Sequence, residues 1–147
     1  MTDNRPIEWN DSLQTGIDEV DEQHKILVNA LNEVETRVTG SSNRRLLDGV
    51  TRDLLAFAIY HFETEERLMK QHGYDTEEPE NAGEHVRQHR AFTERIITLR
   101  AEVLAGQSAA QEALVSFLKD WLTNHIRTTD QRLGRFIRTK LPENRRR

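Results

Sequence analysis

The sequence predicts an all-α fold: an up-down-up-down antiparallel four-helix bundle with an N-terminal arm. Four separate stretches carry apolar residues at spacings of three and four, the period of a helix with one buried face. Only seven glycines and three prolines occur among 147 residues, and most of them lie between these stretches. Short links between successive helices favour antiparallel neighbours. At this length we expect a single domain, residues 1–147.

The N-terminal arm is expected at residues 1–16, where the pattern is aperiodic and Trp9 is the large apolar anchor. The first helix is expected at residues 18–36. Its inner face joins apolar side chains with one histidine: Ile17, Val20, His24, Leu27, Leu31 and Val34. The segment 39–43, Thr-Gly-Ser-Ser-Asn, is typical of a turn and separates this helix from the next.

The second helix should reach about Gln71, with Gly73 ending it. Its inner face includes two polar side chains, in the series Leu47, Val50, Leu54, Phe57, His61, Glu65 and Leu68. Residues 74–80 are strongly acidic, and we expect a loop there. Asn81 and Glu84 have the spacing of a capping pair for the third helix.

The third helix is expected to stop at Gly106. Its inner face carries His85, His89, Phe92, Ile96, Leu99 and Val103. Ser108 and Gln111 have the spacing of a capping box at the start of the fourth helix. The inner face of that helix carries Leu114, Phe117, Leu118, Trp121, Leu122 and His125.

The fourth helix changes phase after its histidine. Five residues of an ideal helix turn the chain by about 500°, so Asp130 would lie about 140° away from His125. The apolar pattern also shifts by one residue there. We predict a π-type turn between His125 and Asp130, which would return both side chains to one face. A straight helix, with Asp130 reaching across from its flank, is the alternative.

Polar side chains on the inner faces of all four helices predict a metal site. A lone histidine on an apolar face is usually a hydrogen-bonded core residue, but this many buried polar groups would exhaust the partners that a core offers. Imidazole and carboxylate ligands suit iron, manganese or zinc. Their number exceeds the needs of one ion, so we expect two ions bridged by the carboxylates. The candidate ligands are His24, His61, Glu65, His85, His89, His125 and Asp130.

The other histidine, His72, is expected outside this site. It lies seven residues beyond Glu65, or about 10 Å further along the helix. We expect it at the surface or against a loop.

Composition excludes several classes of protein. The chain has no cysteine, so it forms neither disulfides nor thiolate metal sites. It lacks an apolar run that could span a membrane, and its N-terminus lacks the apolar segment of a signal peptide. We therefore expect a cytoplasmic protein without membrane insertion.

Residues 127–147 carry eight Arg or Lys and two acids. The basic C-terminal tail, residues 139–147, could dock weakly on an acidic partner or remain solvated; we expect no nucleic-acid binding.

Three motifs in this order after His24 resemble the hemerythrin family, and among its members the single-domain bacteriohemerythrins. They are HxxxE at 61–65, HxxxH at 85–89 and HxxxxD at 125–130. The similarity extends from Trp9 to Asp130, nearly the whole chain. One departure is Asp75, which stands where the family often has proline, in a loop that carries no candidate ligand.

The resemblance implies reversible dioxygen binding at a non-haem di-iron centre, for oxygen storage, transport or delivery. Such a protein is not an enzyme; its partner is dioxygen, and we expect a monomer. The alternatives on the same site are a di-iron redox enzyme or stress protein, which would reduce nitric oxide or peroxide or donate iron, and an oxygen sensor.

The resemblance also implies a division of the ligands between two iron ions linked by an oxo or hydroxo bridge. One iron would take three histidines, His85, His89 and His125. The second would take two, His24 and His61, and keep an open position for dioxygen. Glu65 and Asp130 would bridge the two ions. Leu122 and Ile126 match positions that line the oxygen pocket in this family.

Overall fold

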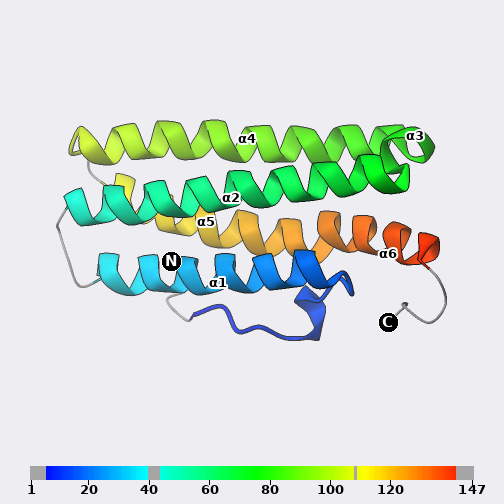
Figure 1. Ribbon diagram of the computed structural model, residues 1–147. Coiled ribbons are helices and arrows are strands. Elements are labelled where there is room, and N and C mark those ends of the chain that lie inside the picture. Colours follow the sequence, from blue (N-terminus) through cyan, green and yellow to red (C-terminus); the bar gives the residue numbers. More distant parts are fainter. Residues whose placement is uncertain (1–5, 40–43, 108, 142–147) are drawn as a thin grey trace.

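A computed structural model describes residues 6–39, 44–107 and 109–141, and the chain is helical through most of these ranges (Figure 1). The elements in chain order are η1 (Asp11–Leu13), α1 (Asp18–Thr39), α2 (Arg44–His72), α3 (Tyr74–Glu77), α4 (Pro79–Leu104), α5 (Ala110–His125), η2 (Ile126–Asp130) and α6 (Gln131–Lys140). Helix α1 packs on α2, α2 on α4, α4 on α5, and α5 on α1. The predicted antiparallel four-helix bundle is confirmed, and none of the described helices combines the length and apolarity needed to cross a bilayer.

The first two helices begin and end close to their expected positions. Helix α1 extends to Thr39, three residues beyond the prediction, and residues 40–43 of the predicted turn lie outside the described part of the chain. Helix α2 ends at His72. Gly73 follows with φ = 79°, a left-handed conformation that glycine adopts without steric cost. Its predicted role as the end of the helix is confirmed.

The link between α2 and α4 differs from the expected loop. Tyr74–Glu77 forms one helical turn, α3. Tyr74 is buried, and its ring lies 5.0 Å from that of Phe136, so an aromatic contact with α6 holds this turn. The capping role of Asn81 was also predicted wrongly, since α4 already begins at Pro79. A proline suits the first helical position because the N–H that it lacks would have no partner there.

The fourth helical rod consists of α5, η2 and α6. Helix α5 begins at Ala110, after Ala109 with φ = 65°. Ser108 of the predicted capping box lies outside the described residues, as do residues 142–147 of the predicted basic tail. Within the described part of that tail, α6 continues to Lys140.

The predicted inner faces are buried almost throughout. The exceptions are Val50, Phe57, Phe117 and Trp121, which are half-buried at the edge of the core. The apolar side chains form two clusters. The larger one lies toward the α1–α2 link and contains residues such as Leu31. The smaller cluster, at the other end of the bundle, includes Ile17, Val20, Leu68, Tyr74, Leu133 and Ile137. The predicted metal ligands lie between the two.

The described part of the N-terminal arm is held against α1 by paired hydrogen bonds. The Ile7 backbone N–H donates to Asn32 Oδ1, and Asn32 Nδ2 donates back to the Ile7 carbonyl, both over 2.9 Å. Further along, buried Asp21 accepts hydrogen bonds from Thr15 N (2.8 Å), Thr15 Oγ1 (2.7 Å) and Gly16 N (3.1 Å). These bonds fix the chain where it enters the bundle.

Gly134 in α6 lies against this entry segment so closely that it has no room for a side chain. A Cβ added there would lie 2.9 Å from both the Thr15 carbonyl oxygen and Thr15 Cβ. We expect Gly134→Ala to lower the free energy of unfolding by about 1–3 kcal/mol through overpacking, as measured by urea unfolding. The matched control is Gly49→Ala in α2, where a Cβ meets nothing within 4 Å; it should raise stability by about 0.5–1 kcal/mol. Equal effects of the two changes would contradict the close contact.

Candidate metal centre

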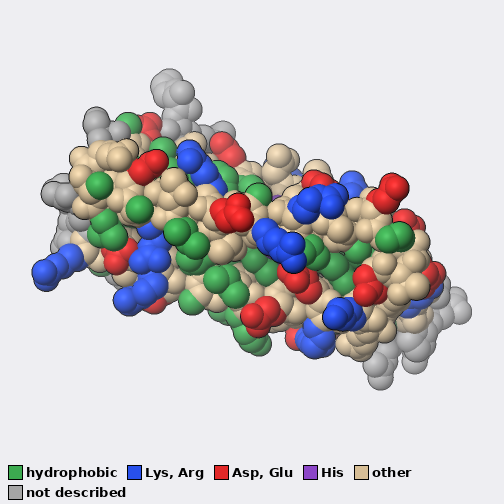
Figure 2. Space-filling model, turned by 90° about the horizontal axis from the view of Figure 1, so that it is seen from above, with side chains coloured by type: hydrophobic (Ala, Val, Ile, Leu, Met, Phe, Trp, Pro, Cys, Tyr) green, Lys and Arg blue, Asp and Glu red, His purple; other side chains and the backbone are tan. Residues whose placement is uncertain are grey.

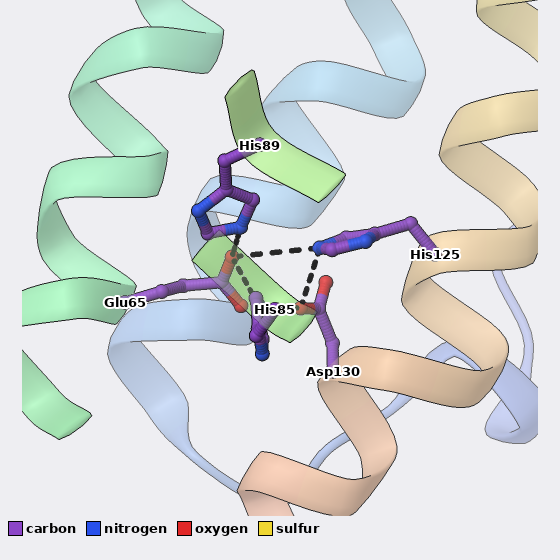
Figure 3. Close-up of side chains that lie close together, drawn as sticks. All are labelled: Glu65, His85, His89, His125 and Asp130. Carbon is purple, nitrogen blue, oxygen red and sulfur yellow. Dashed lines mark hydrogen bonds and ion pairs between the residues drawn. The ribbon is translucent and has the colours of Figure 1, made fainter. Parts of the chain in front are cut away.

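Seven polar side chains from all four rods meet in the middle of the bundle. Each is at most 3% exposed, and they are the seven candidate ligands that the sequence indicates: His24 from α1, His61 and Glu65 from α2, His85 and His89 from α4, His125 from α5, and Asp130 from η2. Figure 3 shows five of them converging on a common point. His72 is half-buried and takes no part in the cluster.

The backbone of η2 brings Asp130 into this cluster. Residues Ile126–Asp130 form a π-helical turn between two α-helical segments, so the predicted π turn is confirmed and the straight-helix alternative is wrong. Asp130 Oδ1 lies 3.0 Å from the Nε2 atoms of both His85 and His125. Its Oδ2 lies 2.8 Å from His24 Nε2. One carboxylate therefore touches imidazoles from three helices.

Glu65 lies on the side of the cluster opposite Asp130 and is likewise surrounded by imidazoles (Figure 3). Its Oε1 atom lies 3.1 Å from the Nε2 atom of His89 and 3.3 Å from that of His61. The Nε2 atoms of His85 and His125 follow at 3.5 and 3.9 Å. Both carboxylates thus lie in the middle of the donor set, and the histidines surround them.

The donor atoms fall into two overlapping groups, and the atoms of each lie within 4.8 Å of one another. One group holds three histidines, His85, His89 and His125, with Glu65 and Asp130. The second holds two histidines, His24 and His61, with the same two carboxylates. Each group has room to surround one cation, and the carboxylates are common to both.

Unpaired buried atoms indicate that these side chains are arranged to bind metal ions and not to form hydrogen bonds with one another. Six of the seven residues, all except His89, have buried nitrogen or oxygen atoms without a hydrogen-bond partner among the described residues. Such atoms are costly in a protein interior. A cation bound among them would satisfy them, and a set of imidazoles and carboxylates is suited to iron, manganese or zinc.

Three of the histidines are oriented by side chains that sequence reasoning missed. His61 Nδ1 donates to Gln23 Oε1 over 2.7 Å, and Gln23 is positioned by Thr64. His89 Nδ1 donates to Glu66 Oε2 over 2.9 Å. These bonds fix the rings with Nε2 facing inward, as outer partners of metal-bound histidines do.

The third partner, Gln88, accepts from His125 Nδ1 over 2.7 Å and from Thr129 Oγ1 over 2.8 Å. All three partners are sequence neighbours of candidate ligands: Gln23 precedes His24, Glu66 follows Glu65, and Gln88 precedes His89. A helical neighbour is turned by about 100°, so each one faces the histidine of an adjacent helix. This adjacency marks them in the sequence as candidate partners, but spacing along one helix does not determine which histidine each would contact.

Aromatic rings cover the cluster on the side of the large apolar core. Phe62 stacks on His89 with ring centroids 3.9 Å apart, and Trp121 stacks on His125 at 4.4 Å. Leu122 and Ile126 are both buried. Leu122 lines a small apolar cavity of about 10 Å³ in this core, whereas Ile126 does not. These side chains keep water away from the candidate ligands.

The two carboxylates raise the pKa values of two neighbouring histidines, His85 and His125. Burial by itself would lower the pKa of His85, but Glu65 and Asp130 outweigh it and raise that pKa to about 10. The pKa of His125 is raised by the same pair against the effect of burial. Burial favours a neutral Glu65, yet His61 and His85 hold its pKa well below the usual range. The pKa of Asp130 is also lowered, since its histidine neighbours outweigh burial and the charge of Glu65.

These shifts predict how the stability of the metal-free protein depends on pH. His85 binds its proton more tightly when folded, so its contribution is complete below the ordinary pKa of 6.5 and is lost as the pH rises through about 10. Glu65 contributes above its ordinary value of 4.5 and loses this contribution as the pH falls. With chelator present, the urea midpoint should therefore decline between pH 6.5 and 10. Metal-loaded protein, whose ligands are already deprotonated, should lack this decline. A metal-free midpoint as high at pH 9.5 as at pH 6 would contradict the expectation.

The chain is similar in sequence to proteins of one family. Residues 15–137 match the family model of the hemerythrin HHE cation binding domain. A bacteriohemerythrin of Stenotrophomonas maltophilia is 34% identical over 84% of this chain and 76% of its own length. One from Pseudomonas aeruginosa is 33% identical over 83% of this chain and 75% of its own length. Myohemerythrin-1 of Phascolopsis gouldii is 28% identical over 85% of this chain and 89% of its own.

A solved structure of wild-type hemerythrin has the same fold. It superposes with a TM-score of 0.78 over 90% of this chain and 98% of that one, at 23% sequence identity. The family model covers most of the chain, including all seven clustered side chains. The protein therefore belongs to the hemerythrin family.

Proposed function

We propose that this protein binds dioxygen reversibly at a non-haem di-iron centre, in oxygen storage, transport or delivery. The observation that carries the proposal is the unequal division of one buried donor set into two groups that share Glu65 and Asp130. A group with two histidines leaves its cation short of ligands compared with a group that has three. Such an open position is what an external ligand requires.

In this proposal the three-histidine group, His85, His89 and His125, would hold one iron ion, and His24 with His61 would hold the other. Glu65 and Asp130 would be shared by both ions. Two iron(II) ions would supply an open coordination position and two electrons that dioxygen can take up and return. The protein contributes five imidazoles and only two anionic groups to this set. A site with few anionic ligands stabilises high-valent iron only weakly. This favours the binding of dioxygen over its strong activation.

The remaining roles belong to side chains that orient the ligands or exclude water. Gln23, Glu66 and Gln88 hold the Nδ1 atoms of three histidines, so that their Nε2 atoms point into the site. Leu122 and Ile126 would form the apolar wall of the oxygen pocket. Both are buried one turn or less from His125, where they limit the access of water to the ions.

The test is an optical spectrum of the protein loaded with iron(II) under argon, then exposed to air, then returned to argon. Metal analysis should give two iron ions per chain. A visible absorption band should appear in air and disappear under argon over repeated cycles. A single irreversible conversion to iron(III) would overturn the proposal in favour of redox chemistry, and a content of one ion or none would overturn the di-iron centre.

A polar substitution in the proposed pocket should shorten the life of the oxygen-bound state. Leu122→Ser would admit water beside the iron ions, and we expect the reversible band to decay in air roughly tenfold faster, equivalent to about 1.4 kcal/mol of activation free energy. The control is Leu118→Ser, which opens the same apolar cavity one helical turn further from His125. Equal acceleration in both variants would indicate general loosening of the core and contradict a specific role of Leu122.

A further inference from the structure

A surface groove between α2 and α4 lies directly outside the candidate metal centre. Its volume is about 420 Å³. The floor is apolar, with Met69 and Ala82 buried and Val86 half-buried. Figure 2 looks onto α4, which forms one side of the groove, and exposed hydrophobic side chains there alternate with charged ones. An apolar floor within a charged rim is the anatomy of a small protein-binding surface.

One residue connects this groove with the centre. Glu66 lines the groove, and its side chain is 42% exposed. The same carboxylate accepts the hydrogen bond from Nδ1 of His89, which is only 3% exposed. His89 Nε2, on the other side of the ring, lies 3.1 Å from Glu65. A partner that touches Glu66 would therefore be separated from the proposed ions by this carboxylate, one hydrogen bond and the imidazole of His89.

The other two outer partners offer no comparable connection. Gln23 is only 7% exposed. Gln88 is half-buried, and its oxygen is occupied by both His125 and Thr129. Neither of them lines the groove. Glu66 is thus the outer partner that a docked molecule could touch.

The rim of the groove carries charges of both signs, with one more cation than acid. Lys70, Arg87 and Arg90 line it, against the acids Glu66 and Asp75. Lys70 and Arg90 are exposed, and neither forms an ion pair within the described parts of the chain. Among the residues that the structure describes, Arg87 pairs only with Glu84 on its own helix, over 3.1 Å. These cations border an apolar floor, and their charge complements that of an acidic partner.

We propose that this groove is the docking site for a small acidic electron-carrier protein, which returns oxidised iron to the oxygen-binding iron(II) state. The electron-transfer role rests on the proposed function, but docking in the groove does not depend on bound iron. Two reduced carriers each lose one electron, two iron(III) ions become iron(II), and solvent supplies a charge-compensating proton. Glu66 and His89 provide the short connection between the carrier and the ions. A contact of this kind is small and transient, as is usual for electron-transfer partners.

Docking is tested first on the iron-free protein. The probe is a plant-type [2Fe–2S] ferredoxin, a small acidic one-electron carrier, titrated at low ionic strength and followed by calorimetry and by amide NMR shifts. We expect shifts centred on the groove, and an affinity at least tenfold weaker for Lys70→Glu/Arg90→Glu. The control, Arg52→Glu/Arg95→Glu, changes the charge equally on exposed positions of the same two helices outside the groove. The difference between the variants should shrink as salt is added.

Electron transfer is tested next on iron-loaded, air-oxidised protein by stopped-flow mixing with the reduced ferredoxin. At low salt the charge-reversed groove variant should be reduced at least tenfold more slowly than wild type and the control variant. Equal affinities and equal rates in the two variants would overturn the inference, as would shifts centred on another face. Failure of reversible oxygen binding in the optical cycle would instead overturn the proposed function, and the iron-free titration would still decide whether the groove docks an acidic carrier.

Discussion

Glu65→Gln should reduce the iron content of the protein from the proposed two ions per chain to one at most. Glu65 Oε1 lies within 3.1–3.9 Å of the Nε2 atoms of four histidines, and it belongs to both donor groups. The substitution keeps the size of the side chain but removes one of two negative charges from a completely buried site. An amide NH₂ facing the cations would repel them. We expect the affinity for the second ion to fall by more than about 100-fold, beyond the effect of losing an outer partner.

The measurement is iron analysis after gel filtration, together with unfolding at a fixed excess of metal. Ligand binding stabilises the folded state by about 2.7 kcal/mol at 100 times the dissociation constant, so Glu65→Gln should lose most of the stabilisation that metal gives. Glu63→Gln, on the same helix but exposed, is the control and should behave as wild type. Two tightly bound ions in Glu65→Gln would show that this carboxylate does not bridge them.

The bundle and its candidate ligands could be predicted because helical periodicity depends on local spacing alone. Apolar residues at intervals of three and four identify a buried face whatever it packs against. The shift of one residue after His125 was therefore visible in the sequence and predicted the π turn of η2. Polar residues on such faces identify the site for the same reason, because a buried imidazole or carboxylate needs a partner.

Contacts between distant segments could not be predicted in this way. The short helix α3 depends on Tyr74 packing against Phe136, more than sixty residues later. Asn81 and Glu84 had the spacing of a cap, but the alternative start at Pro79 was favoured by its fixed φ angle. Gln88 lies at a half-buried position that any polar residue could fill. Its role depends on the distance to His125 in another helix, which spacing along one helix does not determine.

Deleting Thr128 should weaken metal binding without lowering the stability of the metal-free bundle. Thr128 lies in the π turn and is exposed. Without it the aspartate would follow His125 by four residues, the α-helical spacing. Leu133 and Ile137 would then follow His125 by seven and eleven residues, close to whole numbers of turns. The shortened rod can thus be a regular α-helix with every inner residue in phase, and we expect the metal-free variant to be at least as stable as wild type to urea.

Metal binding should nevertheless become about tenfold weaker or worse, because the carboxylate loses the position that η2 gives it. In wild type this one group lies within 3.0 Å of imidazoles from α1, α4 and α5, and a displacement of about 1 Å is enough to impair such a site. Thr128→Ala is the control, since it keeps the chain length and loses only the hydrogen bonds of Thr128 Oγ1, to the Asn124 carbonyl and with Thr129 Oγ1. Undiminished metal affinity in the deletion variant would mean that the π turn only accommodates an extra residue and is not needed to position Asp130. Weaker affinity without loss of stability would mean that an irregular turn is retained because it places Asp130 between the histidines.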